Sequence, residues 1–187
     1  MLLQLSNIIT NYFLKKEIIG IEKKEVLIYG FQLTFSTLSS IITILIFSCL
    51  INIFYGIIFL IFFMPIRFCS GGYHANTYLK CYIYTNSCFV IILLFSKIVL
   101  HLDLLNTYAL LAFIGILYLW LKAPCKNANN PLSEKYIQYN RFITHIILAI
   151  YAIICIITYH ISPFMFLIEF NTVFLVSILF IIGSNEK

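Results

Sequence analysis

The long stretches without a charged side chain restrict this chain to one class of fold. Between Glu25 and Arg67 lie 41 residues without Lys, Arg, Asp or Glu. A helix that crosses a bilayer needs about 20 apolar residues, so this stretch predicts two spanning helices joined near Asn52. Of the 187 residues, 62% are hydrophobic and 10% are charged, whereas soluble domains have roughly 25% charged residues. We therefore expect an integral membrane protein.

Four further apolar stretches complete an all-α fold of about six transmembrane helices. They lie at about 82–100, 105–122, 142–160 and 163–183. Six crossings put both ends of the chain on one side, and eleven of the twelve basic residues fall on that side, Lys97 being the exception. Because Lys and Arg accumulate in short cytoplasmic loops, we expect both termini to be cytoplasmic.

These helices predict a single membrane domain over residues 1–187. We expect its parts to be an amphipathic cytoplasmic segment (1–25), two spans (26–66), a cytoplasmic segment (67–81), two spans (82–122), a cytoplasmic loop (123–141) and two spans (142–183).

The first 25 residues have no basic region before their apolar positions and no small-residue cleavage site, so they do not resemble a signal peptide. Leu5, Ile8 and Tyr12 recur at helical spacing, which predicts an amphipathic helix lying in the membrane surface.

The polar segment 67–81 contains the strongest candidates for chemistry, His74 and Cys81. A thiol becomes a useful nucleophile when a nearby base or positive charge favours its thiolate, and His74 is the natural general base. Residues seven apart in one helix lie about 10 Å apart along its axis, too far for a hydrogen bond, so the chain must bend between them. Gly71 and Gly72 give the backbone that freedom. On spacing alone, the alternative to a catalytic pair is that His74 is an ordinary loop histidine and Cys81 an unreactive thiol.

Gln32 and Arg67 each have two interpretations, one structural and one functional, and the Cys and His residues raise the question of a metal site. Burying the polar side chain of Gln32 at membrane depth costs free energy, so Gln32 either hydrogen-bonds another helix or faces the candidate site. Arg67 either binds an acidic part of a substrate or marks the cytoplasmic boundary. The Cys and His residues between 69 and 88 lack the Cys-x2–4-Cys spacing of zinc sites, so we expect no metal and no cofactor. The net charge of +5 follows from membrane orientation and needs no nucleic acid partner.

The polar segment resembles the AgrB family, accessory gene regulator protein B. The resemblance rests on six residues of the segment: Arg67, Gly71, Gly72, His74, Ala75 and Cys81. The six-span layout, Ala123-Pro124 and Asn130-Pro131-Leu132 extend it over essentially the whole chain.

The resemblance implies a membrane cysteine endopeptidase of the bacterial cell membrane that processes an AgrD-like precursor peptide for quorum sensing. Cys81 would be the nucleophile and His74 its base, with Gln32, Arg67 and Gly72 positioning the substrate or the oxyanion. Cleavage would leave the precursor as a thioester on Cys81, and an internal thiol or hydroxyl would then close a thiolactone or lactone ring.

Two other classes of function remain as alternatives to the peptidase. The chain could be a non-enzymatic peptide exporter, although a transport path needs ionisable groups lining several spans. It could also be a membrane scaffold, which leaves the Gly-Gly-x-His cluster unexplained. With so little soluble mass, the protein could also form a homodimer that encloses the site.

Overall fold

The computed structural model describes residues 2–18, 20–70, 78–102, 104–124 and 134–185, and these contain helices and no strand. The elements are α1 (Leu2–Lys15), the 3₁₀ turn η1 (Ile21–Lys23), α2 (Lys24–Cys49), α3 (Ile53–Ser70), α4 (Tyr78–His101), α5 (Leu105–Lys122), α6 (Glu134–Ile161) and α7 (Pro163–Asn185). Within these ranges five helices are long and apolar enough to cross a membrane, and α5 carries a shorter apolar section, Phe113–Lys122. The prediction of an all-α membrane protein with about six spans is confirmed.

The first two spans form a hairpin whose turn contains Asn52. The side-chain oxygen of Asn52 accepts a hydrogen bond of 3.0 Å from the backbone N–H of Phe54. This bond satisfies one of the N–H groups that the first turn of α3 cannot pair internally. The junction therefore lies where the length of the charge-free stretch predicts it.

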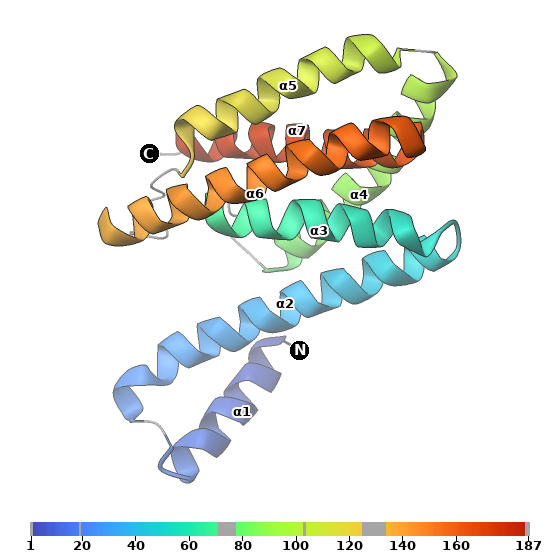
Figure 1. Ribbon diagram of the computed structural model, residues 1–187. Helices are drawn as coiled ribbons and strands as arrows, with labels where there is room; N and C mark the ends of the chain where they lie inside the picture. Colours follow the sequence, from blue (N-terminus) through green and yellow to red (C-terminus); the bar gives the residue numbers. More distant parts are fainter. Residues whose placement is uncertain (1, 19, 71–77, 103, 125–133, 186–187) are drawn as a thin grey trace.

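Helix α7 lies at the centre of the bundle. It packs against α3, α4, α5 and α6, and Figure 1 shows it in red between α5 and α6. Polar side chains of α7 face three of these neighbours, each through a hydrogen bond: Asn171 donates to Ser96 Oγ of α4 (2.9 Å), Ser177 to the Gly115 carbonyl of α5 (3.1 Å), and Glu169 accepts from Thr158 of α6 (2.6 Å).

Helix α1 lies beside α2 at the edge of the bundle (Figure 1). The ring of Phe13 stacks on Phe31 of α2, with centroids 6.0 Å apart. Ser6 and Thr10 are buried, whereas apolar side chains such as Ile8 are exposed. The small polar residues thus allow α1 to approach α2, and its apolar face is left for lipid.

Two helices begin earlier in the chain than the apolar stretches suggest. Helix α4 starts at Tyr78 rather than near 82, and α6 starts at Glu134 rather than near 142. An apolar stretch predicts only the part of a helix that is surrounded by lipid. Polar residues that favour helix formation can extend the helix beyond that part. Both ends of the polar segment are therefore helical, since 67–70 belong to α3 and 78–81 to α4.

Candidate active site

Cys81 lies in the first turn of α4. Its side chain is partly exposed and its thiol is free. The first turn of a helix has backbone N–H groups without partners inside the helix, and its partial positive charge favours an anion that develops nearby. This environment suits a residue whose attack creates negative charge.

The remaining motif residues are only partly within the described chain. His74, Gly71, Gly72 and Ala75 lie outside the described residues, so the predicted pairing of His74 with Cys81 stays a prediction. Arg67 lies in the last turn of α3, half-buried, and is within electrostatic range of the Cys88 thiol on α4. Arg67 and Cys81 are thus held at the two helix ends that border the undescribed segment.

One face of α2 is directed at the start of α4. The Ser36 hydroxyl donates to the backbone carbonyl of Tyr78 at 3.2 Å, and the rings of Tyr29 and Tyr78 have centroids 6.0 Å apart. Gln32 is half-buried and lies between Tyr29 and Ser36 in the chain, and helical geometry puts the three residues within an arc of about 60°. The structure therefore places Gln32 on the face of α2 that approaches the turn carrying Cys81.

A second contact joins the same two helices one turn further along α4. The hydroxyls of Thr43 and Tyr82 lie 3.0 Å apart. Tyr82 follows Cys81 directly, so the two contacts with α2, at Tyr78 and at Tyr82, lie on either side of Cys81 in the chain.

Sequence reasoning missed these hydroxyl groups, although a signal for them exists. Residues 34–43 of α2 include six Ser or Thr residues in ten, in the middle of a membrane span. Such residues usually bond the carbonyl one turn earlier in their own helix. The composition indicates that the middle of α2 carries many hydroxyl groups, but it does not show which of them contact another helix.

The other cysteines of the described residues include two, Cys69 and Cys88, that are partly exposed as Cys81 is. Cys155 is buried between α6 and α7, Cys69 and Cys88 are half-buried, and Cys49 is exposed at the far end of α2. No group of three His, Cys, Asp or Glu side chains that could hold a metal ion occurs in the described part of the chain.

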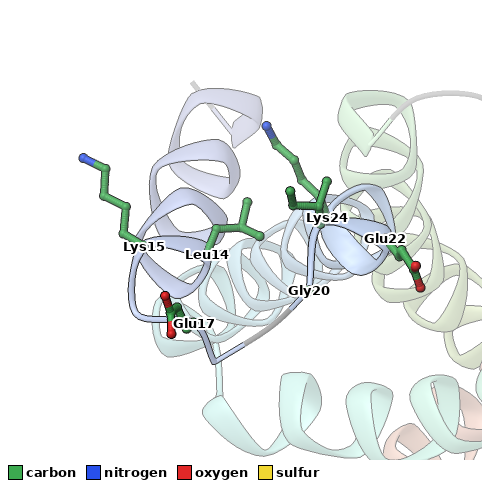
Figure 2. Close-up of a pocket in the computed structure, with 7 residues that line it drawn as sticks. Leu14, Lys15, Glu17, Gly20, Glu22 and Lys24 are labelled. Carbon is green, nitrogen blue, oxygen red and sulfur yellow. The ribbon is translucent and has the colours of Figure 1, made fainter.

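A depression of about 890 Å³ lies at the turn between α1 and α2, and Cys81 is not among the residues that line it (Figure 2). Its charged lining residues are Lys15, Glu17, Glu22 and Lys24, and the rest of the lining includes Leu14 and Ile21. Two cations and two anions favour neither sign of ligand, and none of these side chains is a nucleophile suited to peptide cleavage. We therefore place the candidate site at α4.

The sequence of this chain matches a protein-family model over most of its length. The family model of accessory gene regulator B matches residues 6–184, nearly the whole chain. The chain belongs to the AgrB family. It matches no curated protein and no solved structure. The fold described above is therefore that of an AgrB protein, and the residues that resemble the family motif lie at the ends of α3 and α4 and between them.

Proposed function

We propose that this AgrB protein is a membrane cysteine endopeptidase that cleaves an AgrD-like precursor peptide and supports its cyclisation. Cys81 is the nucleophile and His74 is the general base. The observation that carries the proposal is the position of Cys81, a partly exposed thiol in the first turn of α4, in a chain that matches the AgrB family over residues 6–184.

The chemistry runs through two acyl transfers. His74 takes the thiol proton, and the Cys81 sulfur attacks the carbonyl carbon of the scissile peptide bond. The C–N bond breaks, the leaving amine takes the proton from His74, and the N-terminal part of the precursor remains as a thioester. An internal thiol or hydroxyl of the precursor then attacks this thioester, which forms the ring and returns the Cys81 thiol.

Exchange of one thioester for another is nearly balanced in free energy. A cysteine enzyme can therefore pass its acyl group to a substrate thiol without hydrolysis of the activated thioester bond. That route requires the intermediate to be shielded from hydrolysis. The membrane edge supplies a water-poor surrounding, with Gln32 and Gly72 proposed to position the substrate or the oxyanion. Arg67 is proposed to bind an acidic part of the precursor.

The proposal places the protein in the bacterial cell membrane with both termini and the catalytic segment in the cytoplasm, where the precursor is made. It needs no metal and no cofactor. A homodimer would enclose the site further, and crosslinking in native membranes tests it: a crosslinked ladder supports the dimer, whereas monomer alone rejects it.

The decisive experiment compares Cys81→Ala with Cys88→Ala. Cys88 lies on the same helix two turns on and is also a half-buried thiol. We expect Cys81→Ala to reduce conversion of a co-expressed AgrD-like precursor by at least about a hundredfold, because a covalent route loses its nucleophile. Cys88→Ala should stay within about twofold, since it does not touch the acyl group.

Mass spectrometry of the conversion products separates the possible functions. An acyl-enzyme adduct confined to Cys81 is expected for the peptidase. If Cys81→Ala still converts the precursor, the peptidase assignment is wrong. If the precursor is moved across the membrane uncut, the exporter is the better assignment.

A further inference from the structure

The two contacts between α2 and α4 differ from the way several other hydroxyl groups of the described residues are bonded. Elsewhere on α2, Thr34 donates to the Gly30 carbonyl at 2.8 Å and Ser48 to the Ile44 carbonyl at 2.6 Å, both within their own helix. This intrahelical bond is the usual outcome for Ser and Thr in membrane helices. Ser36 and Thr43 instead reach across to α4.

The Ser36 contact acts on the backbone of α4. A carbonyl has two lone pairs, so the Tyr78 oxygen can accept from Ser36 in addition to a helical N–H. Ser36 is 4% exposed, so water does not compete with this bond in the described structure. The bond therefore holds the first residue of α4 against the middle of α2.

The Thr43 contact acts one turn later, through the hydroxyl of Tyr82. A single contact would leave the first turn of α4 free to rotate about that point. Two contacts at different levels, one on each side of Cys81 in the chain, restrict both the rotation and the axial position of the turn.

We propose that Ser36 and Thr43 are positioning residues that hold the turn carrying Cys81 in the orientation in which its thiol meets the general base. The inference rests on the proposed function, since it concerns the alignment of Cys81 with His74. Neither residue is proposed to touch the substrate. Their effect follows from the steep dependence of catalysis on geometry, in which a misplacement of about 1 Å can cost a hundredfold in rate.

The test removes one hydroxyl at a time without changing volume. Thr43→Val and Tyr82→Phe each break the contact and keep its shape, and Thr43→Ser keeps the hydroxyl. Thr172→Val is the matched control, because that hydroxyl bonds the Ile168 carbonyl of its own helix at 2.6 Å. Ser36→Ala tests the other contact. Each variant is reconstituted in lipid nanodiscs, and the rate at which iodoacetamide alkylates Cys81 is measured by mass spectrometry from pH 6 to pH 10.

If the two residues position Cys81, Thr43→Val and Tyr82→Phe should each slow alkylation at pH 7 by about threefold to tenfold, the equivalent of one lost hydrogen bond. The double variant should be no slower than either single variant. At pH 10, where an ordinary thiol is ionised, all rates should converge. Thr43→Ser and Thr172→Val should follow the wild-type profile, and Ser36→Ala should slow alkylation like Thr43→Val.

Three results would overturn the positioning role. Rates of Thr43→Val and Tyr82→Phe equal to wild type at pH 7 would show that the contact does not align the thiol. Equal losses in Thr43→Val and Thr43→Ser would assign the effect to packing. A difference that persists at pH 10 would assign it to exposure of the thiol.

A separate variant distinguishes this failure from a failure of the proposed function. His74→Ala should slow alkylation at pH 7 at least as much as Thr43→Val. If His74→Ala leaves the profile unchanged, the proposed pair of Cys81 and His74 is wrong, whatever the α2 variants do. If His74→Ala slows the reaction and the α2 variants do not, only the positioning role is rejected.

Discussion

Glu17 adopts a backbone conformation that side chains other than glycine rarely occupy. Its φ is 55°, and it follows the last turn of α1, where the N–H of Ile18 bonds the Phe13 carbonyl and the N–H of Glu17 bonds the Leu14 carbonyl, each at 3.1 Å. This pair of bonds ends many helices and normally places glycine at the left-handed position. A left-handed residue with a Cβ costs about 1 kcal/mol or more.

We therefore expect Glu17→Gly to stabilise the protein by about 1 kcal/mol, which raises the Tm by about 2–4 °C for a chain of this size. Thermal unfolding in nanodiscs measures this. Glu22→Gly is the control, because Glu22 lies in the neighbouring turn η1 with an ordinary φ; it should not stabilise. A lower Tm for Glu17→Gly would show that the side chain contributes more than the backbone conformation costs.

Single residues also show how far the sequence could predict the site. The neighbours of Cys81 in the chain predict that it is the nucleophile, and the structure places it in a partly exposed first turn. The sequence predicts that Gln32 either bonds another helix or faces the site, and the residue lies on the face of α2 that approaches α4. The role proposed for Ser36 and Thr43 could not be predicted, because it depends on which helix they contact and not on their residue type.

The hairpin of α2 and α3 depends on one close approach. A Cβ added to Gly56 would lie 2.8 Å from the Cβ of Ser48 and closer still to its Oγ. Small residues allow this approach, which is how membrane helices gain contact in the absence of a hydrophobic force between them.

Gly56→Ala should therefore force the hairpin apart and destabilise the protein by about 1–3 kcal/mol. Gly30→Ala, in α2, the other helix of the hairpin, is the control, because nothing lies within 4 Å of its added Cβ; it should be neutral or slightly stabilising. Unfolding in a series of SDS mole fractions compares the two. Equal stability of both variants would mean that the helices separate at Gly56 without cost.

Helix positions were more predictable than helix ends. The uncharged stretch between Glu25 and Arg67 fixes two spans and their junction, because a bilayer sets the length of a helix. The sequence predicts spans from about 82 and about 142, whereas helices α4 and α6 begin at Tyr78 and Glu134, since a helix can extend beyond its apolar part. Helix α1 was recognised from its spacing, but its approach to α2 depends on Ser6 and Thr10, which amphipathicity alone reads as exposed.

At the scale of the whole molecule, α7 explains why a bundle with few polar groups has one arrangement. Its hydrogen bonds to α4, α5 and α6 use different sides of one helix. Such bonds are individually modest in membranes, but each requires a particular rotation of α7 and of its partner. The sequence shows these polar residues in the last span without showing their partners, so the packing order could not be predicted.

The distribution of charge predicts the orientation of this bundle in the membrane. Helices α2 and α4 run parallel, because α3 between them crosses in the opposite direction, so Lys24 and Cys81 lie toward the same face. The sequence predicts eleven of the twelve basic residues on that side, so the positive-inside rule predicts that this face is cytoplasmic. In a cysteine-free background, Glu22→Cys should react with a membrane-impermeant maleimide only in inside-out vesicles, and Leu102→Cys, in the turn after α4, only in intact cells. The opposite pattern would put Cys81 on the outer face, away from a newly made precursor, and the proposed peptidase would then need a substrate that has already crossed the membrane.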